Sequence, residues 1–352
     1  MRKAELVFAA IGLLLITAAL IPLVKGQAWW IRVFDFPRLQ LAVVGAVTVL
    51  MYSVLIRKKS ALGYFLILLI SMSVLYQGCR IYPYTPLAPK QVKSSSDSEE
   101  AVTLSLFISN VLMSNRNIDA YLEIIQNYDP DIIIADETDA WWVEGLKKLT
   151  KQYPYSVTYP LDNTYGMSLY SKFRLSGSEI LFLVEKDVPS IHTTVVLPSG
   201  EHVRLHSLHP EPPHPVKSTD TEERDAELLI VAREAGKTKM PTIVAGDLND
   251  VAWSRTTTLF QKTSGLLDPR IGRGLYNTYH AEHPLFRYPL DHIFHSDHFR
   301  IISLERGPYF GSDHFPIYVR LSFEPEKKAE QRGPELDGES RKEADELIRK
   351  RK

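Results

Sequence analysis

Two short polar strings in the C-terminal half of the chain carry residue types that phosphoester chemistry requires. Gly246–Asn249 (GDLN) follows the apolar run Thr242–Ala245, and Ser312–His314 (SDH) precedes the apolar run Phe315–Leu321. Because such runs are typical of buried strands, each string is expected at the tip of a strand. Carboxylate, amide and imidazole groups gathered there favour metal-dependent hydrolysis of a phosphate ester.

The spacing within the first string places two polar groups on one side of the chain. In an extended segment Asp247 and Asn249 point the same way, while Leu248 points to the other side. The acid can then hold a water molecule and the amide a phosphoryl oxygen. An Asx turn that caps the following helix is the alternative for this string.

The histidine of the second string has a candidate partner. Asp291-His292 resembles Asp313-His314 and lies within the apolar run Leu290–Phe294. A carboxylate that accepts the ring N–H of a histidine fixes its tautomer and raises its basicity. We therefore predict that Asp291 orients His314, whereas a lone Asp-His pair is more often a loop cap or a surface contact.

Candidate metal ligands end two earlier runs. Glu137 closes Asp131–Glu137, and Mg²⁺ favours carboxylate oxygens, with water and phosphate completing its shell. Asp136 and Asp139 compete with Glu137 for this role. Asn110 ends the first predicted strand, where its amide oxygen can meet metal or phosphate, although a turn residue is the simpler interpretation.

Three histidines in one segment offer a different metal site. His206, His209 and His214 could suggest zinc. Their spacing and the prolines between them favour an extended loop over a helical ligand face. A single histidine that acts as a phosphate-stabilising acid is the better interpretation.

The N-terminal part of the chain contains the apolar runs Leu6–Val24, Leu39–Ile56 and Leu62–Tyr76. A helix needs about 20 apolar residues to cross a bilayer. A cleaved signal peptide is the alternative for the first run, but two further runs follow and no small-residue cleavage site is evident. We predict that residues 1–80 form a membrane anchor with three transmembrane helices, at about 5–24, 38–56 and 61–78.

Lys and Arg in the short loops predict the orientation. Arg2 and Lys3 precede the first run, and Arg57–Lys59 separates the second from the third. With three spans both clusters share the cytoplasmic side. The large domain then lies on the extracytoplasmic side of the membrane. If only two runs span, this domain moves inside.

Two segments are predicted not to pack. Residues 81–100 are rich in Pro and Ser, which predicts a linker between membrane and domain. Residues 324–352 are almost wholly charged and polar, which predicts a disordered tail, although 341–352 can form a solvated helix. The single cysteine, Cys79, excludes a disulfide within the chain.

Between these segments, residues 101–323 alternate short runs rich in β-branched residues with amphipathic runs, which predicts one α/β sandwich domain. The periodicity does not predict the order of the strands in the sheets. Strands are expected at Val102–Ile108, Asp131–Ala135, Gly166–Ser171, His192–Leu197, Val203–Leu208, Thr242–Ala245, Leu290–Phe294 and Phe315–Leu321. Helices, with Asp119 and Thr221 as caps, are expected at Ile118–Asn127, Ala140–Thr150, Glu222–Ala235 and Arg255–Thr263.

The same region is acidic. It carries 21 Lys and Arg against 28 Asp and Glu, a balance of −7. Nucleic-acid binding usually leaves a basic footprint, and none is visible here. All 11 histidines of the chain fall in this region, which favours a titratable or metal-linked site.

The polar signals occur in a fixed order: Asn110, Glu137, Gly166–Ser171, His209, Gly246–Asn249, Leu290–His292 and Ser312–Pro316. This order resembles the endonuclease/exonuclease/phosphatase superfamily over the whole of 101–323. The resemblance implies a four-layered α/β/β/α sandwich and Mg²⁺- or Mn²⁺-dependent attack of water on a phosphoester. Each motif alone is weak, whereas the ordered set is a strong signal.

The resemblance further implies which residues serve the metal and the water. Glu137 is the metal carboxylate, with Asn110 and Asp313 near the metal. Asp247 orients or activates the attacking water. Asp136 departs from the pattern, because relatives often carry a Gln before the metal glutamate.

The remaining polar residues are implied to serve the phosphate. Asn249 holds a phosphoryl oxygen. His314, oriented by Asp291, acts as base or transition-state stabiliser, and metal and imidazole together neutralise the developing charge. His209 is the second histidine, with His206 as the alternative.

The sequence thus predicts a membrane-anchored, metal-dependent phosphoesterase whose substrate is a nucleic acid, a phospholipid or a small phosphoester. No obligate protein partner is evident. The Pro-rich stretch 210–215 and the acidic domain do not resemble a dedicated DNA nuclease. A catalytically idle scaffold that keeps the fold and a zinc hydrolase that uses His206, His209 and His214 are the alternatives.

Overall fold

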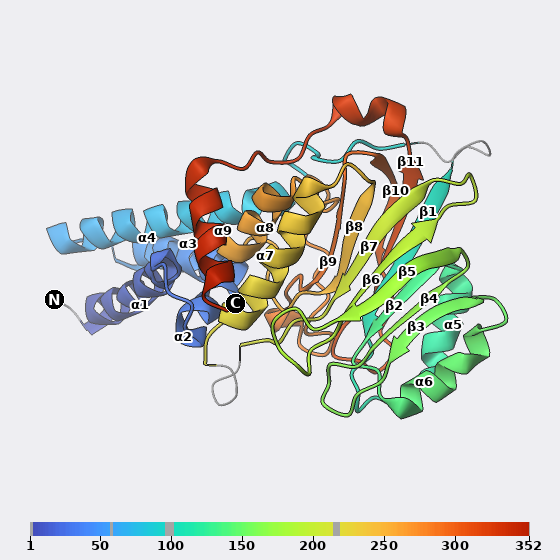
Figure 1. Ribbon diagram of the computed structural model, residues 1–352. Helices are drawn as coiled ribbons and strands as arrows, with labels where there is room; N and C mark the ends of the chain where they lie inside the picture. The colour runs from blue at the N-terminus through green and yellow to red at the C-terminus, as the bar shows by residue number, and fades with distance from the viewer. Residues whose placement is uncertain (1–2, 57–58, 96–101, 214–218, 352) are drawn as a thin grey trace.

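The computed structural model describes residues 3–56, 59–95, 102–213 and 219–351. Three helices project together from one side of a larger α/β body (Figure 1). They are α1 (Lys3–Leu20), α3 (Arg38–Leu55) and α4 (Ala61–Ile81). Each belongs to a helical segment long and apolar enough to cross a membrane, namely Glu5–Leu23, Arg38–Leu55 and Ala61–Tyr84.

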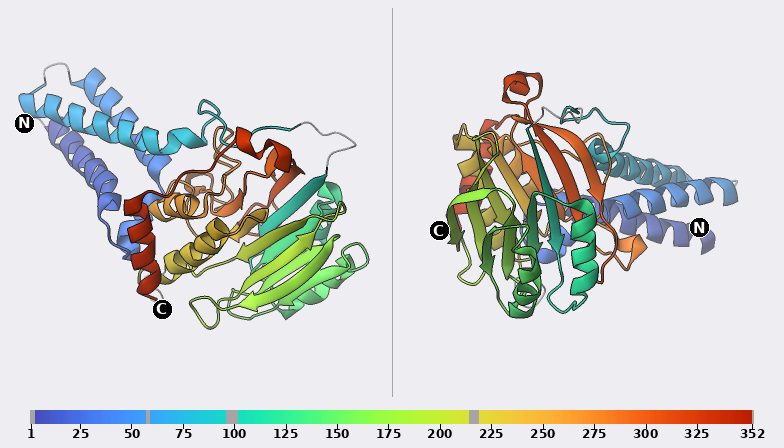
Figure 2. Two further views of the ribbon diagram at one scale, coloured as in Figure 1. Left: turned by 45° about the horizontal axis from the view of Figure 1, so that its top comes forward. Right: turned by 90° about the vertical axis from the view of Figure 1, so that its right-hand side faces the viewer.

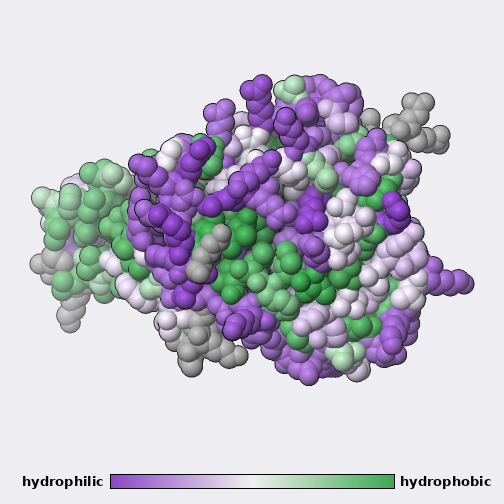
Figure 3. Space-filling view, viewed as in Figure 1, coloured by the Kyte–Doolittle hydropathy of each residue, from purple (hydrophilic) through white to green (hydrophobic). Residues whose placement is uncertain are grey.

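Small residues allow these helices to pack closely. Side chains at Gly12 and Gly45 would collide with Ile70 and Val74 of α4, and small residues serve the same purpose at helix contacts in membranes. Most large apolar side chains of the three helices instead face outward, so the projecting unit has an apolar exterior (Figure 3). Such an exterior suits lipid rather than water.

The connection between α1 and α3 is not a simple turn. It contains the short helices η1 (Ile21–Leu23), α2 (Trp29–Arg32) and η2 (Val33–Asp35). The Trp253 indole donates to the Asp35 carbonyl at 2.7 Å, and the Arg80 guanidinium donates to the Trp253 carbonyl at 2.6 Å. These are two of the hydrogen bonds that join the helical unit to the body.

Two twisted sheets face each other in the body (Figures 1 and 2). The first has six strands in the order β10-β11-β1-β2-β4-β3: Phe299–Arg306, Ile317–Phe323, Thr103–Asn110, Ile132–Asp136, Met167–Ser171 and Tyr155–Tyr159. The second has five in the order β5-β6-β7-β8-β9: Arg174–Leu181, Ser190–Val196, His202–Leu208, Thr242–Asp247 and Asp291–His295.

Helices cover the outer face of each sheet, which completes the four-layered α/β/β/α sandwich. Along β1, Leu106 packs into the core between the sheets, while Phe107 packs beneath the outer helices. The helices on this side are α5 (Ile118–Tyr128) and α6 (Ala140–Leu146), the latter followed by η4 (Lys147–Leu149). On the other side Val244 packs beneath α7 (Glu222–Lys237) and α8 (Arg255–Ser264).

All eight expected strands and four expected helices form, with ends shifted by a few residues. Three strands were not expected. β3 and β5 lie at sheet edges and contain only exposed or half-buried residues, so they lack a strong apolar pattern. β10, also an edge strand, alternates buried and half-buried residues before ending in charged ones.

Of the two expected helix caps, Asp119 is wrong and Thr221 is confirmed in position. Asn117, not Asp119, is the N-cap residue of α5. Thr221 is the N-cap residue of α7, but its hydroxyl donates to the Asp225 carboxylate instead of accepting a backbone N–H. Asp139 caps α6 by accepting the Trp142 N–H at 2.9 Å.

The two segments expected not to pack are ordered against the body over their described residues. In the Pro- and Ser-rich segment, Tyr84 and Val92 are buried, and Ser94 forms a β-bridge with Ile301. The predicted disorder of 324–352 is wrong, because α9 (Gly338–Arg349) packs Ala344 and Ile348 against α7 and α8. A few apolar residues at helical spacing are sufficient to dock this charged helix.

Candidate functional site

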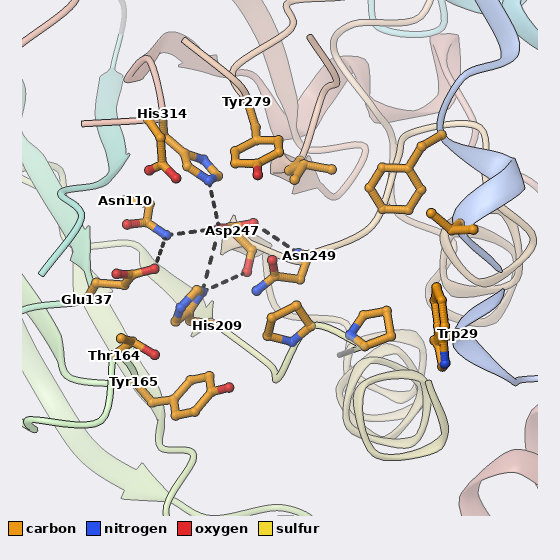
Figure 4. Close-up of a pocket in the computed structure, with 16 residues that line it drawn as sticks. Trp29, Asn110, Glu137, Thr164, Tyr165, His209, Asp247, Asn249, Tyr279 and His314 are labelled. Atoms are coloured by element: carbon orange, nitrogen blue, oxygen red, sulfur yellow. Dashed lines mark hydrogen bonds and ion pairs between the residues drawn. The ribbon is translucent and has the colours of Figure 1, made fainter. Parts of the chain in front are cut away.

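The predicted polar residues meet at one end of the sandwich. β1 of one sheet ends at Asn110, and in the other sheet β8 ends at Asp247 and β9 begins at Asp291, so these three side chains lie at the same end of the sandwich. A cavity of about 340 Å³ opens there, and seven of the predicted residues line it (Figure 4): Asn110, Glu137, His209, Asp247, Asn249, Asp313 and His314. Asp291, the eighth, lies behind His314 and contacts it.

Asp247 occupies the centre of this cluster and is fully buried. Its Oδ2 accepts the Asn110 Nδ2–H at 3.1 Å and lies 3.5 Å from His314 Nε2. Its Oδ1 accepts the Asn249 backbone N–H at 3.0 Å, as in the predicted Asx turn. The backbone N–H of Asp247 donates to Asp136 Oδ2 at 3.1 Å. Both carboxylate oxygens are thus aimed by neighbouring groups.

The residue before Asp247 must be glycine. Gly246 has φ +139°, a conformation rarely adopted by residues with a side chain. A Cβ at this position would overlap the carbonyl oxygen of Leu208 on the neighbouring strand β7. Gly246 therefore allows β8 to turn its carboxylate into the cavity.

Asn110 and Glu137 lie beside Asp247, at the ends of β1 and β2. Asn110 Nδ2 donates to Glu137 Oε1 at 2.9 Å, and its Oδ1 accepts the Leu112 N–H at 2.9 Å. The amide nitrogen, not the oxygen, therefore faces the carboxylates. Glu137 Oε2 accepts the Met113 N–H at 3.1 Å. These bonds leave Asn110 as the residue that orients two acids, and a role as metal ligand stays a prediction.

Two residues of the cluster have left-handed backbone conformations. Glu137 has φ +63° and Asn249 has φ +51°. Asn tolerates this region, whereas a residue such as Glu adopts it at a cost of order 1 kcal/mol. Backbone strain of this kind is concentrated at functional sites, and here it directs the Glu137 carboxylate toward Asn110.

His314 is held by a carboxylate on one side and faces a carboxylate on the other. Its Nδ1 lies 2.8 Å from Asp291 Oδ2, and the ring of Tyr279 packs against it with centroids 5.0 Å apart. Burial opposes the charged imidazolium, but Asp291 and Asp247 outweigh it and raise the pKa of His314 to about 10. The ring is therefore cationic at neutral pH.

The second histidine of the site is His209. It lines the cavity, and its Nδ1 lies 3.2 Å from the Asp247 carbonyl oxygen. Burial opposes the charged form of His209, yet the carboxylates of Asp136 and Asp247 raise its pKa above the ordinary value. His206 points to the other face of the sheet, where its Nδ1 lies 2.7 Å from His192 Nδ1.

This arrangement contradicts the three-histidine zinc site. His206 and His209 lie on opposite sides of their sheet, so they cannot share one ion. His214 lies outside the described residues. The alternative zinc site is therefore wrong for His206.

The charges of the site fit a divalent cation. Burial, Glu137 and Asp247 raise the pKa of the Asp313 carboxyl, and burial raises that of Asp136 to about 7. Among the described residues that line the cavity, none is Lys or Arg. Glu137, Asp247 and Asp313 offer hard oxygen donors of the kind that Mg²⁺ and Mn²⁺ prefer. One oxygen or nitrogen from each of Asp247, Asp291 and His314 also lies within 4.8 Å of the others.

Several residues of the site carry no recognisable signal in the sequence. Tyr279, Thr164 and Tyr165 come from loops, which hydrophobic periodicity does not describe. Arg270 lies buried behind the site, where it donates to the Asp291 carbonyl at 3.2 Å. Ser312 is the exception: it belongs to the SDH string, and its hydroxyl donates to the Asn110 carbonyl at 2.7 Å.

Comparison with known proteins agrees with this geometry. Residues 109–314 match the model of the Endonuclease/Exonuclease/phosphatase family, and the chain belongs to that family of phosphoester hydrolases. A search of the curated proteins found no match.

Solved structures share the fold at low sequence identity. The human Nocturnin catalytic domain with bound sulfate matches with a TM-score of 0.52 and 19% identity, over 64% of this chain and 96% of that one. A humanised D. rerio TDP2 carrying 14 mutations matches with a TM-score of 0.51 and 17% identity, over 63% and 99%. An endonuclease/exonuclease/phosphatase from Beutenbergia cavernae matches with a TM-score of 0.51 and 17% identity, over 63% and 72%. At these identities the likenesses show a shared fold over a little less than two thirds of this chain.

Proposed function

We propose that the protein is a membrane-anchored phosphoesterase that uses Mg²⁺ or Mn²⁺ to hydrolyse a phosphodiester or a phosphomonoester. One observation carries the proposal. Carboxylates, an amide and the His314–Asp291 pair converge on one cavity, which lies at the strand tips of the sandwich that the Endonuclease/Exonuclease/phosphatase family model matches. Glu137 and Asp313 would hold the metal. When bound, the metal supplies Lewis-acid stabilisation of the phosphoryl oxygens.

The side chains of the cavity account for the attack of water. Asp247 orients a water molecule and accepts its proton, while the water oxygen forms a new bond to phosphorus. The bond from phosphorus to the leaving oxygen breaks, and that oxygen takes up a proton. Because His314 is cationic, it stabilises the charge that develops on the phosphoryl group.

Asn249 and His209 complete the phosphate-binding side. The Asn249 amide is anchored by one N–H, which donates to the Pro210 carbonyl at 3.0 Å. Its second N–H is available to a phosphoryl oxygen. The Nδ1 of His209 donates to the Asp247 carbonyl, which leaves Nε2 directed toward the substrate, and the raised pKa of the ring favours the protonated form that can donate there.

The three apolar helices supply the anchor and the orientation. α1 ends and α3 begins beside the α/β body, and α4 also ends there, while α1 begins at the far end of the unit (Figure 1). Crossing the bilayer three times places the basic N-terminal residues opposite the body. The positive-inside rule then supports an extracytoplasmic catalytic domain in a bacterial inner membrane.

The catalytic proposal is tested with the full chain in detergent and bis(p-nitrophenyl) phosphate as substrate. We expect hydrolysis that requires Mg²⁺ or Mn²⁺ and that falls by at least about 10³-fold in Asp247→Ala and His314→Ala. Asp119→Asn, a change at an exposed carboxylate on α5, is the matched control. Full activity in Asp247→Ala or His314→Ala would contradict the assigned mechanism.

Two further measurements test the remaining parts. Calorimetry that finds no affinity for Mg²⁺ or Mn²⁺ would favour a catalytically idle scaffold. For orientation, the C-terminus is fused to alkaline phosphatase, which is active only outside the cytoplasm, or to a fluorescent protein that matures only inside. An inactive phosphatase with a bright fluorescent fusion would overturn the extracytoplasmic placement.

A further inference from the structure

The wall of the cavity opposite the catalytic cluster is built by the segment that joins two of the apolar helices. Trp29, Val33 and Phe36, all from the α1–α3 connection, line the same cavity as Asp247 and His314. In Figure 4 the catalytic residues lie at one end of this space and Trp29 at the other, with Asn249 between them. The cavity therefore runs from the site to the membrane unit.

Chain connectivity places this wall at the membrane surface. Phe36 lies two residues before α3, and η1 begins directly after α1 ends at Leu20. At about 1.5 Å of rise per helical residue, α1 and α3 each span about 27 Å, close to the apolar thickness of a bilayer. The connection between them therefore lies at the membrane–water interface, where Trp is enriched.

Hydrogen bonds fix this wall to the catalytic body. The Trp29 N–H donates to the Thr219 carbonyl at 3.0 Å, and the Thr221 N–H donates to the Gln27 carbonyl at 2.8 Å. The rings of Phe36 and Tyr288 meet edge to face at 5.4 Å. The mouth of the cavity thus keeps its orientation toward the bilayer.

A loop of the catalytic body reaches the bilayer at the same place. Gln40, in the first turn of α3, donates to the Leu285 carbonyl at 2.7 Å. The side chains of Leu285 and Phe286 are 76% and 60% exposed, which is unfavourable in water but not beside a transmembrane helix. The same loop carries Tyr279, whose ring packs on His314.

The lining of the cavity selects against polyanions. Its described residues include no Lys or Arg, and the α/β domain as a whole is acidic. Nucleic acids and polyphosphates are usually bound by basic side chains. The outer part is instead apolar, with Val33, Phe36 and Leu290 among its residues. One phosphate followed by an apolar group matches this distribution.

We propose that the site takes its phosphoester from an amphiphile resident in the bilayer. The phosphate lies against Asp247 and His314, and the apolar part passes Val33 and Phe36 toward the membrane interior. Leu285 and Phe286 insert into the bilayer and hold the mouth of the cavity at the surface. This inference rests on the proposed phosphoesterase function and assigns its substrate class.

The test compares the same phosphoesters with and without acyl chains. The full chain is reconstituted into vesicles of phosphatidylcholine, phosphatidylethanolamine, phosphatidylglycerol and phosphatidic acid in equal amounts. The soluble probes are the deacylated glycerophosphate esters of the same headgroups and bis(p-nitrophenyl) phosphate, and ³¹P NMR reports the products. We expect at least one lipid to be hydrolysed roughly tenfold or more faster than its deacylated form.

Two variants connect this preference to the named residues. Val33→Glu puts a charge into the apolar wall and is expected to lower the ratio of lipid to deacylated turnover by roughly tenfold or more. Leu285→Ser with Phe286→Ser is expected to lower the same ratio without altering the wall. Met240→Ser, an exposed apolar residue at the opposite end of β8 from Asp247, is the control and should keep the wild-type ratio.

The outcomes separate the substrate class from the function itself. Metal-dependent hydrolysis of the soluble probes with no lipid hydrolysed would overturn the lipid assignment alone. An unchanged ratio in both the Val33 variant and the Leu285/Phe286 variant would overturn it as well. No hydrolysis of any probe by the wild type in the presence of Mg²⁺ and Mn²⁺ would instead contradict the proposed function.

Discussion

Asp291 Oδ2 lies 2.8 Å from His314 Nδ1, although the two residues are brought together by different sheets of the sandwich. Asp291 begins β9 of the five-stranded sheet, and His314 precedes β11 of the six-stranded sheet. Because Nδ1 donates to Asp291, Nε2 is directed toward Asp247 at 3.5 Å. The pair therefore links the two sheets through the group that we propose stabilises the transition state.

Replacement of Asp291 tests this orienting role. In Asp291→Asn the amide cannot stabilise a cationic imidazole, so we expect kcat to fall by about 10² to 10⁴-fold with little change in KM. His314→Ala should lower kcat at least as much. Because the two residues act as a unit, the double variant should be no worse than His314→Ala alone. Multiplicative losses in steady-state kinetics would show that they act independently.

The turn before Asp247 gives a prediction about stability and activity together. Ala at position 246 would need both a rare backbone conformation and space occupied by Leu208. We expect Gly246→Ala to lower the free energy of unfolding by about 2 to 4 kcal/mol and to reduce activity even where the protein remains folded. Thermal unfolding in detergent and the kcat of the folded fraction measure the two effects.

A second glycine serves as the control. Gly338 starts α9 with no atom near its missing side chain and no left-handed backbone. Gly338→Ala should leave stability unchanged or slightly raised, because Ala loses less entropy in a helix. Equal losses in both variants would mean that the Leu208 contact does not set the position of Asp247.

The strands of the sandwich core could be predicted from the sequence because each is a short run of apolar residues. Runs such as Ile132–Asp136 are buried on both faces and read as strands without further context. The edge strands β3 and β5 give no such signal, because their stability comes from pairing with one neighbour rather than from their own apolar residues. The packing of α9 was missed for the same reason. Its two buried residues, Ala344 and Ile348, are stabilised by contacts with α7 and α8, which the sequence of α9 does not indicate.

The site also contains some residues that could be predicted from the sequence and others that could not. Asp247 and His314 could be predicted because each follows or precedes a buried run within one string. His206 and His209 could not be distinguished from the sequence, because the choice depends on where β7 ends. The strand ends at Leu208, so His206 lies within it and His209 lies just beyond it. Trp29, Val33 and Phe36 could not be predicted as cavity residues, because their contact with the site depends on how the unit of three apolar helices docks on the body.

Metal removal gives a further prediction. Chelation of divalent ions should abolish activity, and Mg²⁺ or Mn²⁺ should restore it. Glu137→Gln keeps the shape of the side chain but removes a charge from the proposed metal site. We expect it to raise the metal concentration for half-maximal activity by about 10- to 100-fold, which a metal titration measures. Glu144→Gln, an exposed acid on α6, is the matched control and should show no shift.

Glu227 predicts how stability depends on pH. This residue of α7 is fully buried, and its Oε1 has no hydrogen-bond partner among the described residues. Burial, reinforced by Glu185 and opposed by His209, raises the pKa of the Glu227 carboxyl from 4.5 to about 8. Between these two pKa values the folded protein keeps a proton that the unfolded chain releases, so stability falls as pH rises through this interval.

The sign of the effect follows from these two pKa values. Below about pH 4.5 both states are protonated, and the carboxyl imposes no penalty. Between about 4.5 and 8 stability falls as pH rises, and above about 8 the penalty is complete, on the order of a few kcal/mol. Glu227→Gln should remove this slope and raise Tm at pH 8, by about 2 to 4 °C for each kcal/mol gained. Thermal unfolding from pH 5 to 9 measures the slope, with the exposed Glu234→Gln on the same helix as control. Parallel pH profiles for the wild type and Glu227→Gln would show that the buried carboxyl is already ionised in the folded protein.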